Sequence, residues 1–546
     1  MNERSAPPLA RLIVIGIDAA SPELLDAWTA DGTLPHLRLL LDRGLAGRTR
    51  GIEGFFVGST WPSLYTGTNP ARHGVHYLLQ LVPGTYRLHR VAQAEFVRQP
   101  PFWRALSCAG RRVAVLDVPL SRLEADLNGV QTVEWGGHDS LYGFHASPPS
   151  LATELRERFG EHPVGPRCDR AHRTASEYRA FTEALEAGAR RKATWTRELL
   201  ARGGWDLFMQ VFTEAHCAGH QCWHLYDPAH PAHDPGFAAA HGDPLRRVYR
   251  AIDTAIGEVL ELAGDANVVV FSAHGMSYRY GAQFLLHDIL VRLGVMTPLA
   301  PPDVRGPGAR LRSAAVAVWQ RLPSPLRARL RPLTRRLVRQ ERGGEQVSTI
   351  AMDPARSFCF PVNNGLAAGG IRLNLIGREP LGRLAPGAEA NTFCDRLVAD
   401  LMGLVDDRTG RSLVRRVLRT AELYRGEYLD HLPDLVVEWN DEVATGSTAL
   451  AGGTGARVRA RSPAIGVVEG ANDYGRSGEH RPGGWFVAAG PGIERGRLDR
   501  EVSLMDLAPT FARMLGAELP DCDGRPIPEL LGGLEAERGS GEGTPR

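Results

Sequence analysis

The chain has 546 residues, and 64 basic and 62 acidic side chains give it a net charge of +2 at neutral pH. Hydrophobic residues make up 43% and charged residues 23%, which excludes a wholly disordered chain and gives no global sign of binding to nucleic acid or an anionic membrane. The seven cysteines contain no C-x-x-C pair, so neither a disulfide framework nor a cysteine-based zinc ribbon is supported.

The first apolar run of the chain, Leu12 to Ile17, has only six residues before Asp18 interrupts it. Such a run is too short for the hydrophobic part of a signal peptide or for a membrane span, and no other stretch reaches about 18 apolar residues. We therefore expect no transmembrane segment and a cytoplasmic location. At roughly 150 residues per domain, the length fits three or four domains or one large enzyme domain with insertions.

Four short apolar runs have the composition of strands that are buried on both faces. They are rich in Val, Ile, Leu and Phe without clean alternation, and helical stretches such as SPELLDAWTADG separate them. This alternation predicts an α/β fold with a doubly wound, mostly parallel sheet flanked by helices. Ligands of such sheets bind at the carboxyl ends of the strands. The runs are RLIVIGID (11–18), RRVAVLDV (111–118), WDLFMQVF (205–212) and NVVVFSAHG (267–275).

Asp18 directly follows the apolar part of the first run. A carboxylate at the end of an apolar strand is costly to bury alone, so it either caps a neighbouring group or holds something charged. A helix that begins near Ser21 offers the first role, because Asp is a common N-cap residue. A metal ion offers the second role, and this residue alone does not decide between them.

The segment GSTWPSLYTGTNPARHGV (58–75) is dense in hydroxyls and turn-forming residues. We expect a shaped loop with exposed Oγ atoms, among them those of Ser59 and Thr60. A hydroxyl is a poor nucleophile unless a base or a metal lowers its pKa. The alternative is an ordinary loop whose hydroxyls cap helices.

Histidines follow or precede the other apolar runs. His216 and His220 come after the third run and are four residues apart, so on one helical turn they face the same side and can chelate a metal. His274 ends the fourth run, and His480 precedes the apolar segment WFVAAG. For His216 and His220 alone, the alternative is two histidines that lie together on the surface by chance. The recurrence of potential ligands at the ends of predicted strands favours a functional site instead.

The segment from Val304 to Gln340 contains ten arginines and no acidic residue. We interpret it as a solvated, partly helical insertion or cap. The more specific alternative is a surface that binds anionic lipid or nucleic acid, because Trp319, Leu322 and Leu326 offer an apolar face beside the arginines. No nucleic-acid module is evident otherwise, and the oligomeric state stays open. Beyond this segment we expect the strand–helix pattern to resume with IRLNLIGREP and PDLVVEW.

The order of these motifs resembles the alkaline phosphatase superfamily and, within it, the type I phosphodiesterase/nucleotide pyrophosphatase family. A strand with Asp18 is followed by S-T-W-P-S-x-x-T-G-x-N-P-x-x-H-G, x-x-x-G-H, S-x-H-G and G-x-H-R-P-x-G, and the resemblance covers roughly residues 11–290 and 350–530. It extends to RLNLIGREP (372–380), LPDLVVEW (432–439) and VSLMDLAPTFARMLGAELPDCDGRPI (502–527).

The resemblance implies a catalytic domain in two parts, residues 1–290 and 351–532. An Arg- and Pro-rich insertion or cap would occupy residues 291–350, and the Gly-rich residues 533–546 would form a disordered tail.

The resemblance further implies a metal-dependent hydrolase of small phosphoric esters, most closely a phosphodiesterase or nucleotide pyrophosphatase. Two divalent ions about 4 Å apart, usually zinc, would hold the attacking and leaving oxygens. The nucleophile would be Thr60, in the place before Trp61 and Pro62, and the reaction would pass through a phospho-threonine. The implied ligands are Asp18, Thr60 and His274 for the ion of the nucleophile, and His216, His220 and His480 for the ion that activates water.

Two positions depart from the family pattern. The family has Asp where this chain has His216, a change that leaves a three-histidine site of a known catalytic geometry. The family's S-D-H-G is S-A-H-G here, and the methyl group of Ala273 cannot bind a metal. The ion of the nucleophile therefore loses one ligand and one negative charge, and we expect weaker binding unless Glu214 or Asp253 compensates. The sequence therefore leaves open whether the chain binds one metal ion or two.

Other functions also stay open. The same fold supports phosphomonoester hydrolysis, phosphonate hydrolysis and phosphoryl transfer, and a degenerate member would bind a phosphorylated ligand without turnover. A sulfatase is not favoured, because those enzymes need C/S-x-P-x-R around the nucleophile, and this chain has Thr60-Trp61-Pro62-Ser63-Leu64 instead.

Overall fold

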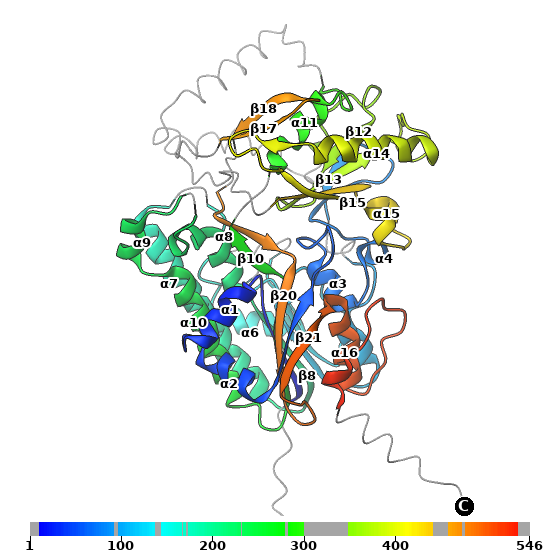
Figure 1. Cartoon of the computed structure of the whole chain (residues 1–546). Helices are drawn as coiled ribbons and strands as arrows, with labels where there is room; N and C mark the ends of the chain where they lie inside the picture. Colours follow the sequence, from blue (N-terminus) through cyan, green and yellow to red (C-terminus); the bar gives the residue numbers. More distant parts are fainter. Residues whose placement is uncertain are drawn as a thin grey trace, which may run out of the picture.

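The computed structural model describes residues 10–91, 97–136, 143–165, 168–170, 173–230, 232–278, 282–299, 348–440, 457–471 and 475–532. These residues form a larger lobe around a nine-stranded sheet and a smaller lobe that lies beyond one end of it (Figure 1). The predicted tail and most of the predicted Arg- and Pro-rich insertion lie outside the described residues. Among the described residues, no helix combines the length and the apolar character needed to cross a membrane.

The nine-stranded sheet confirms the predicted fold class. Five adjacent strands, β9, β1, β8, β5 and β6, are parallel to one another, and the four apolar runs of the sequence form the first four of them. β20 and β7 run antiparallel to their neighbours. In order across the sheet, the strands are β21 (Gly496–Ser503), β2 (Leu45–Arg50), β20 (Gly483–Ala489), β9 (Asn267–Ser272), β1 (Ala10–Ile17), β8 (Trp205–Phe212), β5 (Val113–Leu116), β6 (Gly129–Val133) and β7 (His145–Ser147).

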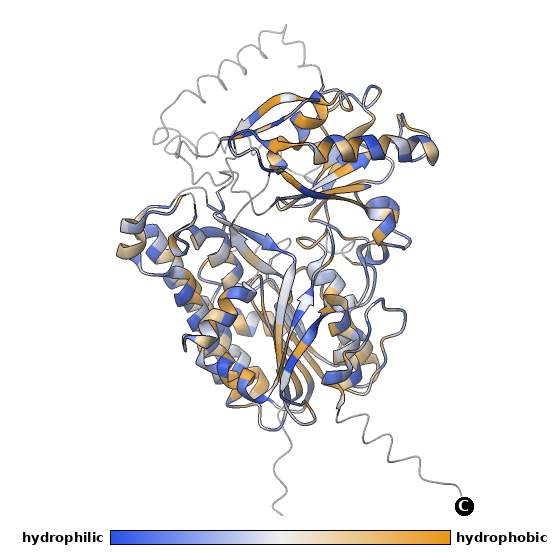
Figure 2. Ribbon diagram, viewed as in Figure 1, coloured by the Kyte–Doolittle hydropathy of each residue, from blue (hydrophilic) through white to orange (hydrophobic). Residues whose placement is uncertain are grey.

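Helices cover both faces of this sheet, which explains why its middle strands lack alternation. Along β1, Leu12 and Val14 belong to one hydrophobic core and Ile13 and Ile15 to the other. In Figure 2 the inner strands of the sheet and many of the helix residues turned toward them are orange, the hydrophobic colour. One core is covered by α1 (Pro22–Ala30), α2 (Pro35–Arg43), α6 (Pro149–Phe159), α7 (Ala175–Ala201), α8 (Glu214–Tyr226) and α10 (Pro244–Leu260), the other by α3 (Thr60–Thr66), α5 (Phe102–Cys108) and α16 (Leu507–Met514).

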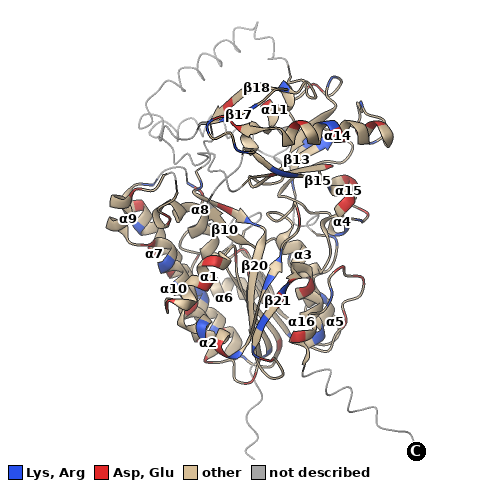
Figure 3. Cartoon of the chain, viewed as in Figure 1, with Lys and Arg blue, Asp and Glu red and all other residues tan. Residues whose placement is uncertain are grey.

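The long predicted helix forms as α7, and local signals set both of its ends. Thr174 and Glu177 make a capping box at its start. Past its end, Gly203 and Gly204 have φ angles of 67° and 69°, a left-handed conformation that glycine adopts without strain. Acidic and basic residues are interspersed on the outer helices (Figure 3), as in the ion pair between Arg38 and Asp42.

The smaller lobe differs from our expectation of a resumed strand–helix pattern. Its main sheet has the order β12 (Cys359–Val362), β13 (Ala368–Leu373), β16 (Leu435–Trp439) and β15 (Val414–Arg419), and all its pairs are antiparallel. Only residues 363–367 join β12 to β13, which is too short for the crossover that a parallel pair requires. The lobe has its own hydrophobic core and also contains α11 (Leu286–Arg292), α14 (Ala388–Met402), β14 (Val405–Asp406), β17 (Arg457–Ser462) and β18 (Gly466–Ala471). The domain boundaries expected above stay a prediction.

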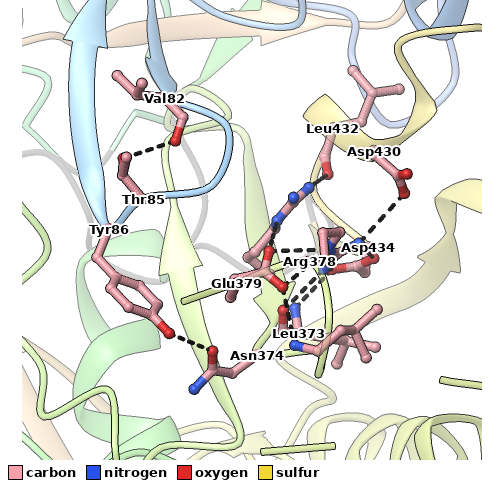
Figure 4. A network of polar contacts seen from close by, with 12 residues as sticks. Val82, Thr85, Tyr86, Leu373, Asn374, Arg378, Glu379, Asp430, Leu432 and Asp434 are labelled. Atoms are coloured by element: carbon pink, nitrogen blue, oxygen red, sulfur yellow. Dashed lines mark hydrogen bonds and ion pairs between the residues drawn. The ribbon is translucent and has the colours of Figure 1, made fainter. Parts of the chain in front are cut away.

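The RLNLIGREP segment (372–380) serves this smaller lobe (Figure 4). Arg372 donates to Glu379 at 2.8 Å, and both side chains are buried. Arg378 donates two hydrogen bonds of 2.7 Å to Asp434, which precedes β16. These charge-assisted bonds hold the turn after β13 against the start of β16. The motif therefore has a structural role here.

Candidate metal centre

The candidate residues gather at one end of the central sheet because β1, β8 and β9 are parallel neighbours. Asp18 follows β1, His216 and His220 lie in the first two turns of α8 directly after β8, and His274 follows β9. His480 lies on β19 (Gly478–Arg481), which pairs with β10 (Gly275–Tyr278). Figure 1 shows α8 and β10 at the end of the larger lobe that faces the smaller one.

Three of the predicted ligands form a compact cluster. One ring nitrogen from each of His216, His220 and His480 lies within 4.8 Å of the others, and all three side chains are buried. The ring centroids of His216 and His480 are 4.8 Å apart, as are those of His220 and His480. Three converging imidazoles are a donor set that zinc prefers. These residues therefore fit a divalent ion.

Asp18 lies against this cluster and is not a helix cap. Its Oδ1 accepts a hydrogen bond of 2.8 Å from the indole of Trp61, and its Oδ2 lies 2.6 Å from Nδ1 of His216. Burial alone would raise the pKa of Asp18, but His216, His274 and the indole together lower it to about 2. Ser21, not Asp18, caps α1 by accepting from the amide of Leu24. The capping interpretation is therefore wrong.

Hydrogen-bond partners fix which nitrogens of His216 and His220 carry protons. Nδ1 of His220 faces the carbonyl of Gly478 at 2.8 Å, and Nδ1 of His216 faces the carboxylate of Asp18. Both partners are acceptors, so both Nδ1 atoms donate, and in the neutral rings both Nε2 atoms carry lone pairs. Yet the two Nε2 atoms are only 2.9 Å apart. Two lone pairs at this distance repel unless a proton or a metal ion lies between or beside them.

His274 is a second sign of a cation. Its ring centroid lies 4.6 Å from that of His480, and neither of its ring nitrogens has a hydrogen-bond partner among the described residues. The residue is 2% exposed, and burial together with His216 lowers its pKa to about 4. A buried imidazole with two unsatisfied nitrogens is costly in an apolar site. It becomes favourable when one nitrogen binds a metal.

The segment around Thr60 differs from the expected exposed loop. It folds into α3 and α4 (Pro70–His73), and Thr60 is 0% exposed with its hydroxyl donating to the carbonyl of Phe56 at 2.7 Å. The expectation of exposed hydroxyls was therefore wrong. Pro62 lies in the first turn of α3 and Pro70 begins α4, where a missing N–H breaks no helical hydrogen bond. Thr60 is linked to the centre through its neighbour Trp61, which contacts Asp18.

A second buried polar group, which the sequence analysis did not find, supports α8. Lys192, the single lysine of the chain, is 0% exposed on α7. Its Nζ lies 3.3 Å from Asp117 and 3.8 Å from Glu214, the first residue of α8. Glu214 also lies 3.2 Å from His162. The available signal was that this lysine occupies an apolar position of the helix. It lies three and seven residues along the helix from other buried side chains and therefore shares their face.

Comparison with known proteins agrees with the motif order. The family model described as type I phosphodiesterase / nucleotide pyrophosphatase matches residues 12–318, more than half of the chain. No curated protein matches the chain. A solved structure of phosphonoacetate hydrolase from Sinorhizobium meliloti 1021 with phosphonoformate is 17% identical, with coverage of 93% of this chain and 96% of that one and a TM-score of 0.48. Murine ectonucleotide pyrophosphatase / phosphodiesterase 5 is 11% identical, with coverage of 94% and 97% and a TM-score of 0.46.

Proposed function

The chain belongs to the type I phosphodiesterase / nucleotide pyrophosphatase family, a family of phosphoryl hydrolases, and from this premise we propose that it hydrolyses phosphoric diesters with the help of bound zinc. The observation that carries the proposal is the 2.9 Å approach of the two Nε2 atoms of His216 and His220. A shared proton or a bound cation relieves the contact between two such nitrogens, and the convergence of three imidazoles on one point favours a divalent ion. The unpartnered ring of His274 supports the same conclusion.

In the proposed arrangement, His216, His220 and His480 hold one divalent ion, and Asp18, Thr60 and His274 hold the other. Such ions lower the pKa of a bound hydroxyl or water and neutralise phosphate oxygens. Asp18 supplies a permanent negative charge, because its lowered pKa keeps it ionised throughout the neutral range. Its contact with His216 also places a proton of that ring on Nδ1, so that Nε2 would be the atom that binds the ion.

Thr60 is the proposed nucleophile. Its Oγ1 must first release the hydrogen bond to the carbonyl of Phe56 and lose its proton. The oxygen then attacks phosphorus, the P–O bond to the leaving alcohol breaks, and the leaving oxygen takes up a proton. The phosphoryl group stays on Thr60 with its remaining alcohol as a diester. Water hydrolyses this ester in a second displacement and regenerates the hydroxyl. In-line attack in each step is favoured when the reacting oxygens are held in place before reaction.

The matched variants Thr60→Ala and Thr66→Ala test this role. Both residues lie on α3, and each hydroxyl donates at 2.7 Å to the carbonyl four residues earlier. We expect Thr60→Ala to lower kcat on bis-p-nitrophenyl phosphate by at least about 1,000-fold. Thr66→Ala should stay within about threefold of wild type, because Thr66 lies six residues away at the end of the helix. Equal activity in Thr60→Ala and wild type would reject the nucleophile.

A binding protein without turnover is the second candidate, and Ala273 is the observation that favours it. Such a protein would bind a phosphorylated ligand but would not release p-nitrophenol from diesters or monoesters at any divalent ion concentration. Against this candidate, the four histidines, Asp18 and Thr60 are all retained, whereas a decayed site would have lost several of them.

A further inference from the structure

The substitution at Ala273 leaves the candidate centre short of negative charge. The side chain there is a buried methyl group at the end of β9. Two divalent ions would bring four positive charges, and Asp18 offsets only one of them. Several neutral imidazoles bind ions but do not balance their charge. Another carboxylate at this end of the sheet would therefore strengthen ion binding.

The two acids that the sequence offered as replacements are committed elsewhere. Asp253 accepts hydrogen bonds from the amides of His36 and Leu37 and from the ring of His36, so it holds the start of α2. Glu214 lies 3.2 Å from His162 and 3.8 Å from the ammonium group of Lys192, which also lies 3.3 Å from Asp117. Both acids therefore contact groups outside the histidine cluster.

Glu479 is a buried acid that directly precedes His480 on β19, and it is 2% exposed. Its Oε1 accepts a hydrogen bond of 3.0 Å from the backbone amide of His480 and lies 3.9 Å from Nε2 of the same histidine. The carboxylate therefore curls toward the ring of His480. Its other oxygen, Oε2, has no hydrogen-bond partner among the described residues.

This environment is unusual for a carboxylate. Among the described residues, no arginine or lysine forms an ion pair with Glu479, and its neighbour His480 belongs to a cluster of histidines. Removing a carboxylate from water costs several kcal/mol unless a cation compensates it. The ring of His480, 3.9 Å from Oε1, connects Glu479 to the centre, where the ring of His274 lies 4.6 Å from that of His480.

We propose that Glu479 is an additional ligand of the ion held by His216, His220 and His480, and that its charge replaces in the centre the one lost at Ala273. The inference rests on the proposed function, because it concerns the same site. It assigns to this chain a ligand from the strand that carries His480, in place of one from the end of β9.

Zinc binding by the full chain tests the proposal without reference to activity. Zinc stoichiometry and affinity are measured against a competing chromophoric chelator for wild type, Glu479→Gln, Glu214→Gln and the double variant Glu479→Gln/Ala273→Asp. Glutamine keeps the acceptor for the amide of His480 and removes only the charge. We expect Glu479→Gln to bind its second zinc ion at least about tenfold more weakly. Ala273→Asp should restore that ion in the double variant, and Glu214→Gln should match wild type.

Melting temperatures give a second measurement that does not depend on stoichiometry. In the presence of a strong chelator, Glu479→Gln should melt at a higher temperature than wild type, because it no longer buries an unpaired charge. In excess zinc the order should reverse. This pattern also shows that the variant is folded.

The outcomes separate the two proposals. If wild type binds two ions and Glu479→Gln binds them equally well, the role of Glu479 is rejected while the proposed function stands. If Glu214→Gln loses the ion instead, Glu214 is the ligand and the assignment to Glu479 is wrong. If wild type binds zinc but never hydrolyses a phosphoester, the proposed function fails while the ligand assignment stands. A wild-type chain that binds no divalent ion rejects both.

Discussion

Oδ2 of Asp18 and Nδ1 of His216 lie 2.6 Å apart, which joins the end of β1 to the first turn of α8 through one short hydrogen bond. The contact connects two groups that the motif order assigns to different ions. It fixes the proton of His216 on Nδ1 and turns its Nε2 toward His220. Asp18 is thus both a proposed ligand and the residue that orients another ligand.

Asp18→Asn is the first variant that this contact suggests. The substitution removes the charge and weakens the hold on His216, so we expect zinc affinity to fall by at least about tenfold. Asp26→Asn is a matched control, because Asp26 also accepts from an indole, that of Trp485 at 3.1 Å, but its cationic partners are Arg48 and Arg497. Competitive chelator titration measures both. Equal zinc affinity in Asp18→Asn and wild type would contradict the assignment.

Zinc should stabilise the folded chain because it relieves the repulsion between the lone pairs of His216 and His220. At a hundredfold excess over the dissociation constant, we expect the melting temperature to rise by roughly 5 °C. His220→Gln should lose most of this rise. His73→Asn should lower both melting temperatures and keep the rise, because His73 bonds to Ser63 outside the centre. A rise that survives in His220→Gln would show that zinc binds elsewhere.

Acid should destabilise the metal-free chain through its buried histidines. Burial, with His76 nearby, lowers the pKa of His73 to about 3, against about 6.5 in an unfolded chain. Between these pH values the unfolded chain binds a proton that the folded chain does not, so stability falls as pH falls, by up to about 1.4 kcal/mol per pH unit for each such histidine. The other histidines with strongly lowered pKa values are His76, His224, His230 and His274.

Urea unfolding at pH 7, 6 and 5 in the presence of a chelator measures this effect. The stability contribution of these histidines is complete above pH 6.5 and is lost progressively below it. His73→Gln should reduce the slope, since it removes one of the protons taken up on unfolding. A midpoint that does not change between pH 7 and pH 5 would contradict the neutral, buried state of these rings.

The buried lysine should be important for stability. Lys192→Met removes the ammonium group and leaves the carboxylates of Asp117 and Glu214 buried without it. We expect a loss of about 3–5 kcal/mol in the free energy of unfolding. Adding Glu214→Gln should recover part of the loss, because one of the two uncompensated charges is then gone. Chemical denaturation measures the free energy of unfolding of wild type and both variants. A Lys192→Met chain as stable as wild type would contradict the role of this ion pair.

The sequence predicted the larger lobe well because its signals are local. An apolar run such as that of β1, followed at once by Asp18, indicates both a buried strand and a site at its carboxyl end. The parallel pairing of β1 with β8 and β9 then brings Asp18, His216 and His274 together without further assumptions.

The remaining features depend on distant contacts. The residues of β13 are all buried, and such a run does not distinguish a parallel from an antiparallel neighbour. The burial of the Thr60 hydroxyl follows from packing around α3, which no spacing in the sequence reveals. The same holds for Glu479: only the folded chain brings its Oε1 to 3.9 Å from Nε2 of His480 and buries its Oε2 without a hydrogen-bond partner among the described residues.

Elemental analysis of the protein purified without chelator tests the central claim most directly. The account predicts about two zinc or other divalent ions per chain, removed by a strong chelator and regained on dialysis against zinc, with hydrolysis of bis-p-nitrophenyl phosphate lost and restored in step. A chain that holds no divalent ion, and regains none on dialysis against zinc or manganese, would contradict it.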